Sequence, residues 1–139
     1  MTPSSRTLPH VGEWKVRLRA DTLEDIFAAV ARSVARRVGT SHGPAGDWEE
    51  VTVAARDRIA LLVDWANELI GRSEVAGRAY SEVRNIAIAR EGSAPLQLRA
   101  EVRGTPIREW LSPLKAATYH DAIIECVNGH WRAELLFDV

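Results

Sequence analysis

The dipeptide Asn128-Gly129 constrains the fold of this 139-residue chain more than any other feature. Both central residues of a two-residue type I′ hairpin turn need a positive φ, and Asn-Gly is the pair that favours it most strongly. Strand-like runs lie on either side, over residues 116–127 and 131–137. The sequence therefore predicts two antiparallel neighbouring strands at the C-terminus.

A strand and a helix are predicted near the other end of the chain. Apolar and basic residues alternate over residues 14–20, as in a strand with one buried face. Apolar residues then recur at steps of three and four over residues 23–38. Asp21 or Thr22 is a suitable N-cap for this helix, and Gly39 marks its end.

The remaining patterns define the fold class. After a glycine-rich loop and a strand over residues 48–55, a second amphipathic helix is predicted over residues 57–72, with Gly71 near its end. Further strands are predicted over residues 80–90 and 96–103, with a break at 104–106. The predicted fold is α+β, with two amphipathic helices covering a mostly antiparallel sheet.

The chain length suits one domain. Residues 1–9 are polar with two prolines and predict a loose leader, so the domain is expected over residues 10–139. No apolar run approaches the roughly 20 residues of a membrane span, and no signal-peptide core is found near the N-terminus, so a cytoplasmic protein is expected. Cys126 is the only cysteine, which excludes an intrachain disulfide, and its strand context predicts a buried side chain.

The charge balance argues against a general nucleic-acid-binding protein. Lysine and arginine number 18 and aspartate and glutamate number 19, so no overall positive field attracts DNA or RNA. Contact with RNA is expected to be weak or indirect, and contact with DNA is not expected. Arg32, Arg36 and Arg37 form a local basic cluster on the first helix. This cluster is either a solvated helix face or a docking patch for an acidic partner.

The sequence contains none of the common catalytic signatures, such as a phosphate-binding glycine loop or a nucleophile elbow. The C-terminus offers different chemistry, because the carboxylate of Asp138 and the terminal carboxylate of Val139 adjoin each other where the last predicted strand ends. Close carboxylates repel unless a cation lies between them, and calcium or magnesium prefers such oxygen ligands. The alternative is a frayed, solvated terminus.

Several segments resemble the archease family. Residues 115–120, KAATYH, and 134–139, ELLFDV, are similar to its C-terminal pattern of a lysine, small apolar residues, Thr-Tyr-His, a hairpin and a final Phe-Asp-Val or Phe-Asp-Ile. Residues 61–70 resemble the family's second helix, and residues 22–27 the start of its first. The resemblance covers nearly the whole chain and implies an archease-like fold related to the SHS2 fold.

Archeases are accessory proteins of the RtcB-type RNA ligase, which joins RNA ends through a guanylylated histidine. The resemblance implies that this protein promotes ligase guanylylation and multiple turnover in tRNA splicing and RNA repair, through a transient contact with the ligase. It implies an activator and not an enzyme. By the same resemblance Lys115 and Asp25 have assisting roles, while Glu13, Asp138 and the Val139 carboxylate hold a divalent cation, calcium in the first place and magnesium as the alternative.

The N-terminal motif departs from the family. Archeases usually read His-Thr-Ala-Asp-Val-Gly before the first strand, whereas residues 10–15 are HVGEWK and Glu13 replaces the metal-binding aspartate. One alternative is therefore a divergent archease fold that binds or chaperones proteins without a metal. A second alternative is a free-standing metal-dependent hydrolase.

Overall fold

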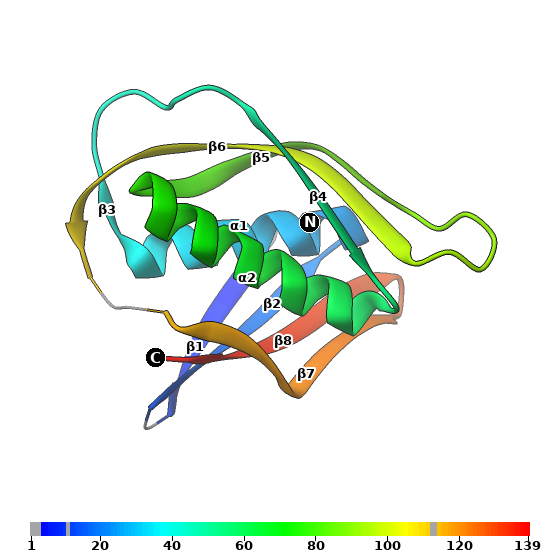
Figure 1. Ribbon diagram of the computed structural model, residues 1–139. Coiled ribbons are helices and arrows are strands. Elements are labelled where there is room, and N and C mark those ends of the chain that lie inside the picture. The colour runs from blue at the N-terminus through cyan, green and yellow to red at the C-terminus, as the bar shows by residue number, and fades with distance from the viewer. Residues whose placement is uncertain (1–3, 11, 112–113) are drawn as a thin grey trace.

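Two helices lie between two antiparallel sheets (Figure 1). The computed structural model describes residues 4–10, 12–111 and 114–139. These residues form, in chain order, β1 (Ser4–His10), β2 (Glu13–Ala20), α1 (Leu23–Val38), β3 (Gly39–Ser41), β4 (Glu49–Ala55), α2 (Arg58–Ala76), β5 (Arg78–Ala89), β6 (Leu96–Trp110), β7 (Ala116–Val127) and β8 (His130–Asp138). The predicted α+β class is confirmed, with two sheets in place of one.

The first sheet has the strand order β1-β2-β8-β7. The predicted hairpin joins β7 to β8: Val127 pairs with His130, and Asn128 and Gly129 have φ values of 51° and 80°. Strand β8 also pairs with β2 in an antiparallel register that runs from Glu13 opposite Asp138 to Ala20 opposite Trp131. The end of the chain is thus a central strand.

Strand β6 organises the second sheet, because β3, β4 and β5 all pair with it. It continues to Trp110, so the predicted break at residues 104–106 is wrong. Gly104 is needed there for close packing: a Cβ atom at this position would lie 2.9 Å from the carbonyl oxygen of Ala79 in β5. The glycine therefore serves a close strand contact and not a turn.

Helix α1 begins at the predicted residue, and α2 begins one residue later than predicted, because Asp57 is its N-cap. The Thr22 hydroxyl accepts a hydrogen bond from the Asp25 amide, and the Asp57 carboxylate accepts one from the Ala60 amide. Helix α2 extends to Ala76, so the predicted end near Gly71 is wrong. Gly77, with a φ of 67°, caps the helix and donates a hydrogen bond to the Ser73 carbonyl.

One hydrophobic core joins the helices to both sheets. Trp65 of α2 is fully buried, stacks edge-on against Phe27 of α1 at 6.3 Å between ring centroids, and donates its indole N–H to the Phe27 carbonyl at 2.9 Å. The hydrogen bond satisfies the one polar group of the indole that this burial removes from water. The two helices are therefore fixed directly to each other as well as to the sheets.

Two predictions at the sheet edges are corrected. Residues Ser4–His10 form the edge strand β1 and not a loose leader, while residues 1–3 lie outside the described residues. An edge strand needs hydrogen bonds on one side only, so Pro9, which has no amide hydrogen, is tolerated in it. Cys126 is exposed on β7, because β7 is the opposite edge strand of this sheet and parts of its surface face water.

Candidate functional site

The register of β2 against β8 brings together two of the predicted carboxylates. Glu13, the first residue of β2, lies directly opposite Asp138, the last residue of β8. Residues directly opposite each other in an antiparallel pair have Cβ atoms about 5 Å apart and point to the same face. Glu13 is partly exposed and Asp138 is exposed. The two carboxylates therefore share one end of the outer face of the sheet.

Val139 remains attached to the same sheet end. Its amide donates a hydrogen bond to the carbonyl of Gly12 at 3.4 Å, and its side chain packs, partly buried, against the core. These contacts extend the β2–β8 pairing by one residue. The predicted third anionic group, the carboxylate of Val139, thus follows directly after Asp138 on a chain segment that is held on both sides.

Lys115 lies beside this pair. Its backbone amide donates a hydrogen bond to the carbonyl oxygen of Asp138 at 2.9 Å, and the next residue, Ala116, is the register partner of Asp138. The Lys115 side chain is exposed. Glu13, Asp138, Val139 and Lys115, which are predicted from three separate parts of the sequence, therefore meet at one end of the first sheet.

Asp25 lies at the other end of that sheet. It belongs to the first turn of α1, which follows Ala20, and Ala20 is paired with Trp131 near the β7–β8 hairpin. Seven residues of extended strand separate Ala20 from Glu13, a length of about 23 Å. The structure does not bring Asp25 to the other four predicted site residues. Its position suits the positive end of the helix dipole.

The last turn of α1 approaches the carboxylate end. The guanidinium carbon of Arg37 lies 5.1 Å from the centre of the Trp14 ring, and this ring packs on Phe137 at 4.9 Å. Trp14 and Phe137 are the inward-facing neighbours of Glu13 and Asp138. Arg37, which the sequence suggested only as part of a basic cluster, therefore lies at this end of the sheet, on the inner face opposite to the carboxylates.

A second residue that sequence reasoning missed is Asn67 of α2. Its side-chain oxygen accepts a hydrogen bond from the Ala117 amide at 2.7 Å, and its side-chain nitrogen donates to the Ala117 carbonyl at 3.2 Å. Ala117 lies two residues after Lys115, so Asn67 fixes the start of β7. Asn67 lies within residues 61–70, which resemble a family motif, but nothing in the sequence indicates its partner.

The donor set suits a hard cation. Glu13, Asp138 and the Val139 carboxylate offer only oxygen ligands, which calcium and magnesium prefer. The structure describes no salt bridge or side-chain hydrogen bond for Asp138 among residues 4–10, 12–111 and 114–139. No group of three or more His, Cys, Asp or Glu side chains in that part of the chain is arranged to hold a metal. The side chains of Glu13 and Asp138 thus do not by themselves form such a group.

None of the described helices combines the length and apolar character needed to cross a membrane. Both helices are instead packed between sheets. The candidate site is formed by strand ends of the first sheet.

Solved structures share this fold over nearly the whole chain. The solution structure of protein 1598 from Methanobacterium thermoautotrophicum matches with a TM-score of 0.78 at 21% identity, covering 97% of this chain and 98% of that one. A crystal structure from Thermotoga maritima, described as an archease and possible chaperone, matches with a TM-score of 0.66 at 18% identity and covers 96% of each chain.

Sequence relatives agree with these structures. The protein archease of Methanopyrus kandleri is 29% identical over 95% of this chain and 96% of its own length. That of Thermococcus gammatolerans is 31% identical over 94% of each. The family model described as "Archease protein family (MTH1598/TM1083)" matches residues 6–139. The chain belongs to the archease family.

Proposed function

We propose that this protein activates an RtcB-type RNA ligase, promoting its guanylylation and multiple turnover in tRNA splicing and RNA repair. It acts as an accessory protein, and the ligase performs the chemistry. One observation carries the proposal: Lys115 donates its amide to the Asp138 carbonyl, and Asp138 lies opposite Glu13. The residues to which the family resemblance assigns activity and metal binding therefore converge, with the exception of Asp25.

The surroundings of the site support contact with another protein. Trp110, the last residue of β6, and the following Leu111 lie close to the last turn of α1, where the Leu111 amide donates to the Val38 carbonyl at 3.0 Å. Each of the two apolar side chains is 52% exposed. Tryptophan beside arginine is typical of the residues that contribute most to protein interfaces, and Arg36 and Arg37 occupy the same turn. A small, mixed apolar and basic surface suits a transient complex.

The charged groups of the site suit contact with the phosphates of a nucleotide bound to the ligase. Glu13, Asp138 and the Val139 carboxylate would hold a divalent cation, calcium first and magnesium as the alternative. When bound, the cation supplies positive charge that attracts phosphate oxygens. Lys115 contributes a flexible ammonium group on the same sheet end, which can contact a phosphate or a carboxylate of the ligase.

The proposal is tested by measuring transfer of the guanylyl group from GTP to the ligase at substoichiometric amounts of this protein. The wild type is expected to stimulate the reaction, and Lys115→Ala is expected to abolish the stimulation. Lys115 uses only its backbone in the fold, so the substitution leaves the sheet intact. Arg99→Ala, at an exposed basic residue of the second sheet, is the matched control and should stimulate fully.

Two outcomes would overturn the proposal: no stimulation by the wild type, or full stimulation by Lys115→Ala. Stimulation that survives metal chelation but is abolished in Lys115→Ala would retain the activator role and remove the cation from it. Turnover of GTP or cyclic-phosphate RNA without any ligase would instead establish a free-standing hydrolase.

A further inference from the structure

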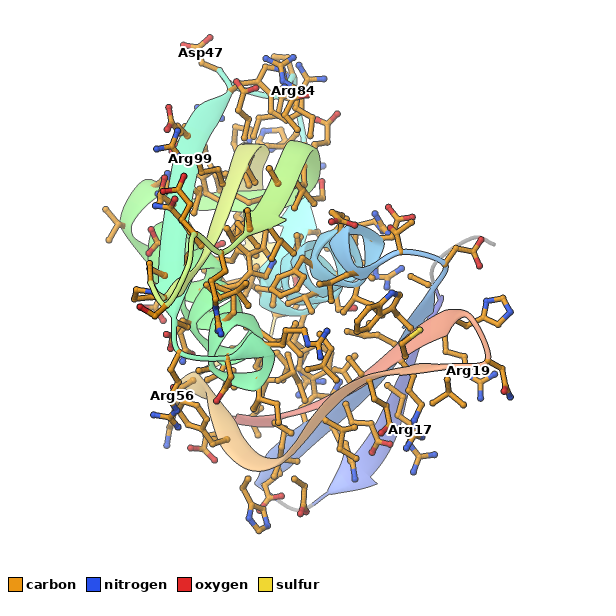
Figure 2. The ribbon with its side chains drawn as sticks, turned by 90° about the vertical axis from the view of Figure 1, so that its right-hand side faces the viewer. Arg17, Arg19, Asp47, Arg56, Arg84 and Arg99 are labelled. Carbon is orange, nitrogen blue, oxygen red and sulfur yellow. The ribbon has the colours of Figure 1, made fainter. Side chains whose placement is uncertain are left out.

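The outer face of the first sheet carries a row of cations. In β2 the side chains of Trp14, Val16, Leu18 and Ala20 are buried, so the alternate residues Lys15, Arg17 and Arg19 lie on the opposite face. Figure 2 shows Arg17 and Arg19 projecting from the sheet on the side away from the helices. Arg132 of β8 lies on the same face, because it is the register partner of Arg19. We call Arg17, Arg19 and Arg132 the arginine face.

The register of the strands places like charges against each other on this face. Arg19 lies directly opposite Arg132. Like charges in directly opposite positions destabilise a strand pair. An anion bound between the two guanidinium groups would offset their repulsion. The repulsion therefore destabilises the free protein more than a complex with an anion.

At the hairpin end of this face the carboxylates do not balance the cations. Glu134 is the nearest anion to Lys15 at 3.2 Å and to Arg17 at 3.6 Å, and it also lies 3.9 Å from Arg132. Glu125 pairs with Arg132 as well. Two carboxylates thus face the three cations of the arginine face, which leaves an excess of one positive charge at the hairpin end. Glu13 and Asp138 lie at the other end of the same face. Arg19 has no ion-pair partner anywhere in the described ranges of the chain.

Two adjoining hollows give an anion a place to bind. One, of about 240 Å³, is lined by Arg17, Arg19, Arg132 and Glu134 together with Leu18 and Ala133. The other, of about 200 Å³, lies at the hairpin end and shares Arg19 and Arg132 with the first. Both hollows are open to solvent. The two guanidinium groups that oppose each other therefore border both binding positions.

We propose that the arginine face binds the phosphodiester backbone of single-stranded RNA, with Arg19 and Arg132 contacting phosphates. Guanidinium groups match the oxygens of a phosphate in two parallel hydrogen bonds. A nucleic-acid strand presents one such charge per nucleotide and can occupy both hollows in turn, which a single acidic side chain of a protein cannot. The inference goes beyond the proposed function, because it requires no ligase.

The arginine face and the carboxylate site lie on the same face of the sheet but apart from each other. Arg19 and Glu13 lie on the same face of β2, six residues apart, or about 20 Å along an extended strand. The arginine face and the carboxylate site therefore occupy opposite ends of the same sheet face. A local positive face of this kind is compatible with the overall charge of −1.

The test measures fluorescence anisotropy of a labelled single-stranded RNA of roughly 12 nucleotides, within the usual site size of strand-binding surfaces. The wild type is expected to bind with an affinity that falls steeply with salt. Arg19→Ala combined with Arg132→Ala should weaken binding at least about tenfold and reduce the salt slope by roughly 0.7 for each phosphate that is no longer neutralised. Arg99→Ala, on the second sheet, is the matched control and should bind as the wild type does.

Arg19→Ala alone guards against a folding artefact, because Arg19 has no ion-pair partner to lose among the described residues. It should retain the wild-type thermal midpoint and still weaken RNA binding. Equal RNA binding by wild type and the double variant, or an equally weakened Arg99→Ala, would overturn the inference. Binding of poly-glutamate in preference to RNA would also overturn it and identify an acidic protein as the partner. Guanylylation of the ligase, measured without RNA, tests the proposed function separately.

Discussion

Asn67 of α2 pairs with both backbone groups of Ala117 in β7, accepting from the amide at 2.7 Å and donating to the carbonyl at 3.2 Å. Strand β7 is an edge strand, so its outer backbone groups have no neighbouring strand to pair with. At Ala117 the Asn67 side-chain amide makes the hydrogen bonds that such a strand would make. Lys115 lies two residues earlier. A residue in the middle of a helix thus helps to hold the start of the strand that follows Lys115.

Asn67→Ala is expected to lower the free energy of unfolding by about 1–3 kcal/mol, because it leaves partly buried groups of Ala117 without their partners. It should also reduce stimulation of the ligase, since the start of β7 and Lys115 lose their anchor. Urea denaturation checks the first effect and guanylylation the second. Glu74→Ala, at an exposed position of the same helix, is the control and should stay within about 0.5 kcal/mol of wild type. Equal stability of the two variants would contradict the anchoring role.

A second prediction concerns Tyr80, whose buried hydroxyl donates a 2.8 Å hydrogen bond to Glu49. Glu49 also accepts from Arg72 at 3.1 Å. Burial, together with the hydrogen bond to the Glu49 carboxylate, raises the pKa of Tyr80 from 10.0 to about 12. The folded state therefore holds this proton more tightly than the unfolded state. Stability from this group is complete below pH 10 and is lost as the pH rises toward 12.

Tyr80→Phe should accordingly cost about 1.5 kcal/mol at neutral pH and remove part of the alkaline loss of stability. Urea denaturation at several alkaline pH values checks the slope, and absorbance of the phenolate checks the pKa. Tyr119→Phe is the control, because Tyr119 is exposed. If wild type and Tyr80→Phe lose stability in parallel as the pH rises toward 12, the buried hydroxyl is not responsible.

A third prediction concerns the cation. Calorimetric titration of calcium is expected to give saturable heats with wild type and none with Asp138→Asn, which removes one charge without changing the side-chain shape. Glu13→Asp should bind more tightly, because it provides the shorter carboxylate that the resemblance to the archease motif implies at this position. Glu91→Ala, an exposed acid between β5 and β6, is the control. Equal weak heats in wild type and Asp138→Asn would instead support the alternative of a protein-binding or chaperone module without a metal.

Much of the fold was predictable, because its signals are local. The strand period of residues 14–20, the cap at Thr22 and the positive φ required by Asn128-Gly129 each depend on neighbouring residues only, and each prediction is confirmed. The strand β1 was missed because the composition of residues 4–10 does not indicate a strand. These residues form one through their antiparallel pairing with β2. Whether these residues form a strand therefore depends on pairing with another segment and not on their own sequence.

The candidate site was predictable only in part. Residue identity and family resemblance select Glu13, Asp138 and Lys115, but the register between β2 and β8 decides that they meet. The same resemblance selects Asp25, and the helix direction places it at the opposite end of the sheet. The arginine face was missed for a related reason. Arg17 and Arg19 alternate visibly in the sequence, whereas Arg132 joins them through cross-strand pairing.

A fourth prediction uses two glycines whose roles were misread from the sequence. Gly71 lies inside α2, and a Cβ atom there would meet nothing within 4 Å. Gly104 lies inside β6, where a Cβ atom would lie 2.9 Å from the Ala79 carbonyl oxygen and 3.0 Å from the Cβ of Arg78. In the sequence both glycines look like the end of an element. In the structure only Gly104 is packed closely against a neighbouring strand.

Gly71→Ala is expected to stabilise the protein by about 0.5–1 kcal/mol, because alanine restricts the unfolded chain and suits a helix interior. Gly104→Ala should destabilise it by about 1–3 kcal/mol, since the new methyl group forces β5 away from β6. Thermal and urea denaturation of both variants check the signs. A destabilising Gly71→Ala would mean that the helix ends earlier than Ala76, and a neutral Gly104→Ala would mean that β5 and β6 are not closely paired at Gly104. Opposite signs from the same substitution would establish that strand contact, and not turn formation, requires Gly104.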